Sequence, residues 1–338
     1  MKEYGIVVFL QNVSKQTIMR KIGVEFLLML FVMASVIVGC RKNDAQLLGI
    51  VATEEVVNNY GTIVEVSYSD DTKMYFRLLS DKTAEVVNYH RFYLDLTEGT
   101  PWVYRGDICI PEKFVHDGKT YTVTCIGKEA FAEAGGWDSY YDHISLVSSV
   151  VMPNSIDTIR DKSFKECKNM TAITIPNSVV YIGEEAFWGA GLDSITLPPS
   201  VAFLGKSALS FTKLTSIMIP QSILRIAPFT FYGCKDLVSV TFHDQLESIG
   251  DYAFAESGFS RFEIPSSLTS IGLHIIENTK VTTLVCHPSV PPVLNTAFTT
   301  PYIGICESLE TIYVPEESVE AYKGALQWQR YKDMIVGM

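Results

Sequence analysis

The sequence has little positive charge for its length. Its 27 lysine and arginine residues are outnumbered by 38 aspartate and glutamate residues, so the 338-residue chain carries a net charge of −11 at pH 7. The first 39 residues carry +2, which leaves −13 on the rest of the chain. Because an acidic surface repels a phosphate backbone, we expect no nucleic-acid partner.

Cysteine and catalytic motifs are also scarce. Six cysteines follow Cys40, far below the density of a small domain held together by disulfides. The sequence contains no nucleophile elbow, glycine-rich phosphate loop or HExxH run. The histidines share no spacing with carboxylates or cysteines (His90, His116, His143, His243, His274 and His287). These absences predict a protein that is not an enzyme and that holds no metal and no cofactor.

One pattern recurs along most of the chain. We call its reference position the anchor, and it returns every 22 or 23 residues, at Pro153, Pro176, Pro198, Pro220, His243, Pro265 and His287. Apolar residues stand one, three and six places before each anchor, and three, six and eleven places after it. A fixed period of this length predicts one elongated solenoid and not two ordinary domains.

Each unit predicts one short parallel strand per coil. The apolar residues before the anchor alternate with polar ones such as Thr174 and Thr196, which is the period of a strand with one buried face. Proline at the anchor ends the strand, because proline has no N–H for the ladder. The glycine seven places after the anchor is expected to supply a turn of positive φ (Gly183, Gly205, Gly250 and Gly272).

Residues 1–39 are typical of a secretion signal. Arg20 and Lys21 precede an apolar run over 22–38, which is short for a membrane span and suits a signal-peptide core. The run ends at Val38-Gly39-Cys40, which resembles the lipobox of bacterial lipoproteins. That resemblance implies lipidation of Cys40 and a protein that meets the membrane through its N-terminal lipid only. The alternative is a plain membrane anchor with an incidental cysteine. Residues 1–18 are superfluous to such a signal, so Met19 is an alternative start.

The segment over 40–103 lacks the anchor pattern. Alternation over 62–66 and 74–78 predicts strands, with turns at 69–71 and 80–82. We expect a tether and a β-rich N-terminal cap here, because a solenoid needs its first coil covered. The solenoid is expected over 104–308, with a hairpin turn at 116–119 in its first unit, and the last strand and C-terminal cap over 309–338.

An insertion interrupts the period. Phe131 and Phe164 occupy equivalent positions but lie 33 residues apart, and the surplus falls at about 134–145. Insertions in solenoids emerge as loops, so Trp137, Tyr140 and Tyr141 are candidate ligand-binding residues. The alternative is that these aromatic side chains fold back onto the neighbouring coil.

The strand positions two and four places before the anchor should face solvent. They are Ala172, Thr174, Ser194, Thr196, Ser216, Met218, Ser239, Thr241, Arg261, Glu263, Thr283 and Val285. The side chains of this row can form hydrogen bonds but offer no acid–base pair, so they suit binding of a partner and not catalysis. Met218, Arg261 and Glu263 are further candidate ligand-binding residues. The alternative is that serine and threonine are simply good residues for an exposed strand.

Cys167 and Cys234 both lie fourteen places after an anchor, where other units have alanine, serine or threonine. They are three coils apart, about 14 Å at the usual strand spacing, which is too far for a disulfide bond. We therefore expect buried thiols at these two positions. Bonds between Cys286 and Cys306, or between Cys109 and Cys125, are left open for an oxidising compartment.

Two runs carry a family resemblance. Residues 214–220 (LTSIMIP) and 249–254 (IGDYAF) resemble the BspA-type leucine-rich repeats of bacterial surface proteins. The resemblance covers about 104–338, where residues 309–331 are similar to the family's C-terminal cap. It implies a repeat solenoid of leucine-rich-repeat-like coils and a binding role at the cell surface, which in some relatives is adhesion to host matrix proteins. A lipobox before such repeats is similar to lipoproteins of the Bacteroides group, which implies the outer membrane. Histidine in place of proline, at His243 and His287, is a departure that concerns local geometry.

These observations favour a non-enzymatic, lipid-anchored cell-surface protein that binds a host or envelope protein or glycan through its solenoid. Two alternatives stay open. One is a carbohydrate-active or accessory enzyme with a site in the 134–145 loop or the N-terminal cap, which a converging carboxylate pair about 5–10 Å apart would favour. The other is a purely structural envelope component.

Overall fold

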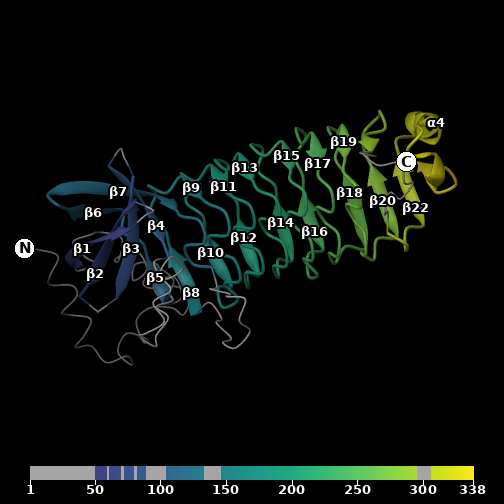
Figure 1. Cartoon of the computed structure of the whole chain (residues 1–338). Coiled ribbons are helices and arrows are strands. Elements are labelled where there is room, and N and C mark those ends of the chain that lie inside the picture. Colours follow the sequence, from purple (N-terminus) through teal and green to yellow (C-terminus); the bar gives the residue numbers. More distant parts are fainter. Residues whose placement is uncertain are drawn as a thin grey trace, which may run out of the picture.

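The chain forms an elongated stack of coils, with a β-rich unit at the N-terminal end and the short helix α4 (Val319–Gly324) at the other (Figure 1). The computed structural model describes residues 50–58, 61–69, 72–79, 82–88, 104–132, 146–294 and 306–338. Cys40 and the 134–145 loop therefore lie outside the described residues. The repeat solenoid predicted from the 22–23-residue period is confirmed.

Each coil contains the expected strand just before the anchor. These first strands are β8 (Leu146–Val151), β10 (Ala172–Thr174), β12 (Ser194–Thr196), β14 (Ser216–Met218), β16 (Ser239–Thr241), β18 (Arg261–Ile264), β20 (Thr283–Cys286) and β22 (Thr311–Val314). Neighbours such as β10 and β12 pair in parallel, with Ile173 opposite Ile195. Both isoleucines are buried, so each coil adds one apolar rung to the core.

A second strand of two residues adds to the expected one in every coil from that of β8 to that of β20. These second strands are β9 (Thr158–Ile159), β11 (Tyr181–Ile182), β13 (Phe203–Leu204), β15 (Arg225–Ile226), β17 (Ser248–Ile249), β19 (Ser270–Ile271) and β21 (Val293–Leu294). They also pair in parallel, with Ile182 opposite Leu204. The second residue of each strand is buried and the first is exposed or half-buried, so the solenoid presents a second row of side chains.

The N-terminal strands extend the second-strand ladder. The strands β1 (Ile50–Asn58), β2 (Gly61–Tyr68), β3 (Lys73–Leu78) and β4 (Thr83–Val87) form an antiparallel meander, and β4 pairs in parallel with β7 (Lys119–Ile126). The sheet continues from β7 through β9 and β11 to β13. The strands expected at 62–66 and 74–78 are thus present. They cover the edge that the first coil would otherwise expose.

The expected hairpin turn at 116–119 is also present. It joins β6 (Lys113–His116) to β7, and Asp117 and Gly118 adopt φ values of 48° and 67°. Two consecutive residues of positive φ are the signature of a tight hairpin turn whose twist matches the flanking strands. Beside it, β5 (Arg105–Cys109) begins the first-strand row by pairing in parallel with β8.

The C-terminal end closes the stack with short elements. A 3-10 turn η2 (Glu316–Ser318), α4 and a second 3-10 turn η3 (Gln329–Tyr331) lead to β23 (Ile335–Gly337), which pairs in parallel with β22. Tyr322 and Trp328 are buried, and their polar atoms donate hydrogen bonds to the carbonyl oxygens of Pro288 (2.9 Å) and Pro292 (3.1 Å). Both rings can therefore be buried without an unpaired polar atom.

The core is a continuous column of side chains from neighbouring coils. The phenylalanines eleven places after the anchor stack on one another, with ring centroids 5.1 Å apart for Phe164 and Phe187 and for Phe231 and Phe254. Leu209 interrupts this column between Phe187 and Phe231. Because no coil could bury its own apolar face, stability comes from the interfaces between neighbours.

The glycines after the anchor have a different role from the one expected. Among the described glycines, positive φ occurs only at Gly106, Gly118, Gly189 and Gly233, so the turn explanation is wrong for the repeated glycine. A Cβ on Gly205 would lie 2.5 Å from the carbonyl carbon of Gly183. Glycine is needed because adjacent coils approach closely. Positive φ falls two places later on ordinary residues, for example Glu185 and Ser207.

A ladder of serine hydroxyls also links the coils. Ser178, Ser200, Ser222 and Ser267, each two places after an anchor, donate to carbonyl oxygens of the preceding coil at 2.5–2.8 Å. Gln245 replaces serine in the coil anchored by His243, and there the His243 ring nitrogen Nε2 lies 2.9 Å from the carbonyl oxygen of Ile223. Histidine at that anchor therefore performs the hydrogen bonding that serine performs elsewhere.

Candidate binding surfaces

The row of first strands presents the side chains that the alternation predicted. The residues two and four places before the anchor are exposed in β10, β12, β14, β16 and β18. Met218 is 69% exposed, which is high for a large apolar side chain. Val285 is an exception: it was expected at the surface but is buried. Near the C-terminal end this face is therefore covered.

Arg261 and Glu263 form a charged group with His287. Arg261 Nε lies 3.1 Å from Glu263 Oε1, and His287 Nε2 lies 3.4 Å from Glu263 Oε2. Burial alone would raise the pKa of the Glu263 carboxyl, but the hydrogen bonds from Arg261 and His287 outweigh it and lower that pKa. The carboxylate is thus kept ionised by neighbours that also neutralise it. Met218 lies two coils away on β14, so it is not part of this group.

The second-strand row carries an apolar patch that the sequence reasoning missed. Val180, Tyr181, Phe203 and Leu224 are all exposed, and we call them the aromatic patch. The rings of Tyr181 and Phe203 stack with centroids 4.8 Å apart and planes 3° from parallel. A signal was available: four and five places after the anchor, other coils have polar pairs such as Glu247-Ser248 and Thr269-Ser270.

Charged side chains border the aromatic patch. Arg225, beside Leu224, pairs with Glu247 of the next coil, with Arg225 Nη2 3.1 Å from Glu247 Oε2. Burial beside its neighbours raises the pKa of the Tyr181 hydroxyl, and the nearby Asp161 adds to this effect. Tyr181 is therefore neutral at physiological pH. An apolar centre with a charged rim is the arrangement found in protein–protein interfaces.

A further row of aromatic rings follows the turns on the other side of each coil. Trp188, Phe211 and Tyr232 meet edge to face, with centroids 5.2 and 5.3 Å apart. Lys165 Nζ lies 4.5 Å from the Trp188 ring centroid, and the Tyr232 hydroxyl donates to Glu256 Oε1 at 2.6 Å. That hydrogen bond is the main reason why the pKa of Tyr232 rises to about 12. Trp188 and Tyr232 are half-buried, so this row is less exposed than the aromatic patch.

The cysteines serve packing in this structure. Cys167 and Cys234 are buried as expected, and their thiols donate to the carbonyl oxygens of Phe131 (3.3 Å) and Leu209 (3.1 Å). No cysteine in the described ranges forms a disulfide bond, so neither of the two bonds left open by the sequence is formed (Cys109, Cys125, Cys286 and Cys306). Burial raises the pKa of the Cys286 thiol strongly, which disfavours the reactive thiolate.

A charged network around the buried Glu85 joins the N-terminal sheet to the first coil. Glu85, only 1% exposed, pairs with Arg77 and with Arg160, whose Nε lies 3.0 Å from Glu85 Oε2. The same Arg160 nitrogen donates to Cys125 Sγ at 3.2 Å, and burial raises the pKa of that thiol to about 12. Each charge has a partner, so the network links the two units.

One group of side chains could hold a metal ion. The sequence indicated no metal ligands, but the fold brings Glu55 of β1 beside His116 and Asp117 of the hairpin. The separation of Glu55 and His116 along the chain explains why the spacing of residues in the sequence gave no signal for a metal site.

Four of the expected site residues lie outside the described residues, namely Trp137, Tyr140, Tyr141 and Cys40. Within the described part of the chain, no helix is long and apolar enough to cross a membrane.

Comparison with known protein families identifies the type of repeat. A family model described as BspA type leucine rich repeat region matches residues 136–257 and 224–328, with six copies of the repeat. These matches together span more than half of the chain. No curated protein matches the sequence.

Several solved structures are similar to this chain. A leucine-rich repeat protein from Bacteroides ovatus is 20% identical with a TM-score of 0.45, and the match covers 78% of this chain and 70% of that one. A leucine rich cell surface protein from Faecalibacterium prausnitzii is 19% identical with a TM-score of 0.48, covering 80% and 72%. A leucine rich repeat protein from T. pallidum is 21% identical with a TM-score of 0.40, covering 54% and 85%.

Proposed function

The chain belongs to the family of BspA type leucine-rich repeat proteins, and from that premise we propose that it is a non-enzymatic surface protein that binds a partner protein through the aromatic patch. It reaches the surface as an outer-membrane lipoprotein anchored at Cys40. The observation that carries the binding proposal is the stacked, exposed pair of Tyr181 and Phe203, flanked by Val180 and Leu224.

A protein fits this patch better than a glycan. A sugar ring stacks on an open aromatic face, but Tyr181 and Phe203 each cover one face of the other. Together with the exposed side chains of Val180 and Leu224 they make an apolar surface, which matches apolar side chains of a partner protein. Exposed aromatic residues inside a charged rim are typical of the energetic centre of a protein interface.

The charge of the chain limits the kind of partner. Beyond the first 39 residues the net charge is −13, so the solenoid attracts proteins with a basic surface. Electrostatic attraction of this kind speeds association and is screened by salt. A partner with a basic surface can be a host matrix protein or an envelope protein.

Two other surfaces remain candidates for additional contacts. The first-strand face offers Met218 and the pair of Arg261 and Glu263. The 134–145 loop offers Trp137, Tyr140 and Tyr141 on the sequence evidence alone. Either surface would extend an interface centred on the second strands.

The binding proposal is tested with the purified full chain on an array of matrix proteins, envelope proteins and glycans. We expect saturable binding to a basic protein that weakens as salt is raised, and that falls about tenfold or more in the variant Y181S/F203S. Phe211→Ser is the matched control, because it removes an aromatic ring of similar exposure outside the patch. Loss in Met218→Ser or in R261A/E263A instead would assign binding to the first-strand face.

The anchoring proposal has its own test. Cells that express the full chain are fed labelled palmitate, and we expect label in the wild-type protein and none in Cys40→Ser. The acyl chains hold the wild-type protein at the membrane, since each buried CH₂ supplies about 0.8 kcal/mol. Label that persists in Cys40→Ser would show that another residue carries the lipid, and a wild-type protein that stays in the membrane without label would favour the plain apolar anchor.

A further inference from the structure

The two edge strands of the N-terminal sheet come together at a seam. β1 is the first strand of the sheet order, and β6 pairs only with β7. Residues of β1 and β6 nevertheless contact one another. Thr53 Oγ1 donates to the carbonyl oxygen of Val115 at 3.3 Å, although Thr53 and Val115 lie 62 residues apart in the sequence. The seam has no strand ladder of its own among the described pairings, so side chains must hold it.

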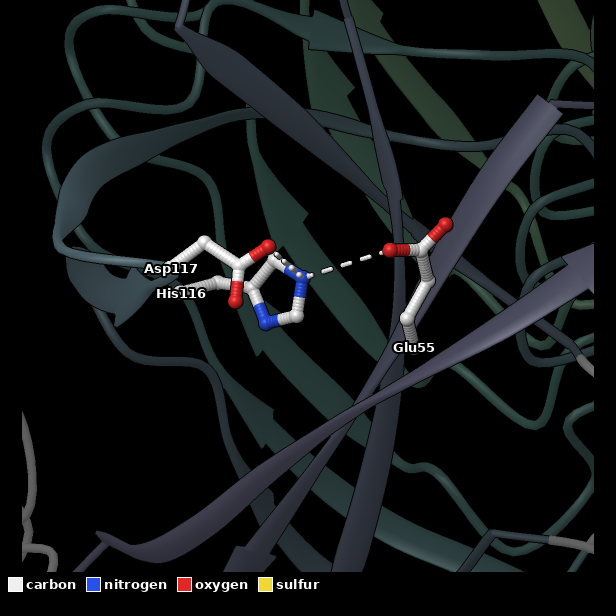
Figure 2. A group of neighbouring side chains, drawn as sticks. All are labelled: Glu55, His116 and Asp117. Atoms are coloured by element: carbon white, nitrogen blue, oxygen red, sulfur yellow. Dashed lines mark ion pairs between the residues drawn. The ribbon is translucent and has the colours of Figure 1, made fainter.

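Three potential metal ligands converge at this seam. His116 Nε2 lies 4.0 Å from Glu55 Oε2 and 3.7 Å from Asp117 Oδ2, and Figure 2 shows both carboxylates directed at the same ring nitrogen. All three ligand atoms lie within 4.8 Å of one another. Ligands bonded to one zinc ion at about 2.0–2.2 Å are about 3–4 Å apart, so the group is already close to the required spacing.

The histidine at the centre is buried and incompletely paired. His116 is 6% exposed, and its Nε2 has no hydrogen-bond partner among the residues that the structure describes. Distances of 3.7 and 4.0 Å to the carboxylates are too long for hydrogen bonds. A buried polar nitrogen without a partner is costly, whereas an ion placed between the three groups would satisfy it.

The other ring nitrogen is held as a metal-binding histidine requires. His116 Nδ1 lies 3.4 Å from Thr53 Oγ1, so that hydroxyl can accept the Nδ1 hydrogen and leave Nε2 free as a ligand. The hairpin turn fixes Asp117 next to His116 through its positive φ of 48°. Glu55 and Asp117 are exposed, so their side chains are free to move the remaining distance inwards.

We propose that Glu55, His116 and Asp117 bind a zinc ion that closes the seam between β1 and the β6–β7 hairpin. One imidazole nitrogen and two carboxylate oxygens suit zinc, which takes four ligands and would complete its shell with water. Calcium and magnesium prefer shells made of oxygen only, so the histidine selects against them. The ion links the start of the N-terminal sheet to the unit that carries the first coil.

The test is a zinc titration of the full chain, after removal of metals with a chelator, in competition with a chromophoric zinc indicator. We expect one zinc ion per chain, and affinity about tenfold lower or worse in Glu55→Gln and in Asp117→Asn. Both substitutions are nearly isosteric and affect exposed side chains, so they leave the fold intact where His116→Ala could disturb it. His287→Gln is the matched control, because His287 also lies beside a carboxylate but outside the group.

Hydrogen exchange supplies the second measurement. Zinc should slow amide exchange over residues 50–58 in the wild-type chain and leave it unchanged in Glu55→Gln. The proposal is overturned if no stoichiometric zinc binding is found, or if Glu55→Gln and Asp117→Asn bind zinc like the wild type. It is also overturned if His287→Gln loses the binding, or if zinc binds without slowing exchange in β1.

Discussion

At the scale of single residues, departures from the repeat have local explanations in hydrogen bonding. His243 replaces the anchor proline and Gln245 replaces the ladder serine in the same coil. The structure couples the two changes, because His243 Nε2 pairs with the carbonyl oxygen of Ile223 that serine would otherwise reach. The sequence showed both departures but could not show that one compensates for the other, since the link lies in the preceding coil.

This coupling predicts a rescue. His243→Pro should lower the free energy of unfolding by about 1–3 kcal/mol, because it leaves a buried carbonyl unpaired. The double variant H243P/Q245S should recover most of that loss, because it restores the proline and serine of the other coils. Urea unfolding of the wild type, both single variants and the double variant measures the coupling. If the losses of unfolding free energy from the two substitutions simply add, with no rescue by serine, the proposed coupling through the serine ladder is contradicted.

Buried thiols should make the protein less stable in alkali. Burial raises the pKa of Cys234 from its usual value of 9.0 to about 11, although a hydrogen bond involving Thr212 opposes this. The unfolded chain releases this proton at lower pH than the folded chain, so the stabilising contribution is complete below about pH 9 and is lost as pH rises towards 11. Raising pH from about 8 to 10 should cost about 1 kcal/mol through this thiol.

The measurement compares the wild type with Cys234→Ala. Both are unfolded in urea at the two pH values, and the difference between their losses isolates Cys234 from other titrating groups. The wild type should lose about 1 kcal/mol more than the variant. Equal losses would show that the folded-state environment of Cys234 does not favour the thiol.

At the scale of elements, the first strands follow from the alternation before each anchor, and the N-terminal strands from their own period. The second strands have only two residues, such as Tyr181–Ile182, which is too short for a periodic signal. They form because parallel neighbours lie one repeat away and pair with them. The role of the glycine was misassigned for the same reason: its constraint comes from the neighbouring coil, which a single coil's sequence does not contain.

The glycine explanation gives a direct prediction. Gly205→Ala should lower the free energy of unfolding by about 1–3 kcal/mol, because the new methyl group would overlap the backbone of the preceding coil. Gly324→Ala is the control, since nothing lies within 4 Å of its added methyl group, and it should be neutral or slightly stabilising, by at most about 1 kcal/mol. Equal effects of the two substitutions in thermal or urea unfolding would contradict the close approach of the coils.

At the scale of the whole molecule, the period predicted the solenoid, the parallel strand before each anchor and the buried rows of apolar residues. The candidate surfaces were predicted less well. The exposed residues of the first strands follow from alternation, but the aromatic patch depends on which corner of the coil faces solvent. The zinc site depends on contact between Glu55 and His116, which are brought together only when the sheet curls. The aromatic patch and the proposed zinc site both depend on contacts between distant parts of the folded chain, so a local sequence pattern does not show them.

The central claim is that the aromatic patch is where the protein meets its partner. The most direct test places a photo-crosslinking phenylalanine analogue at Tyr181 in the full chain on intact cells, with Phe211 as the matched position, since both rings are partly exposed. Illumination in the presence of the basic protein identified by the array should give a covalent adduct from position 181 and little or none from position 211. Equal adducts at both positions, or an adduct from 211 alone, would contradict the account.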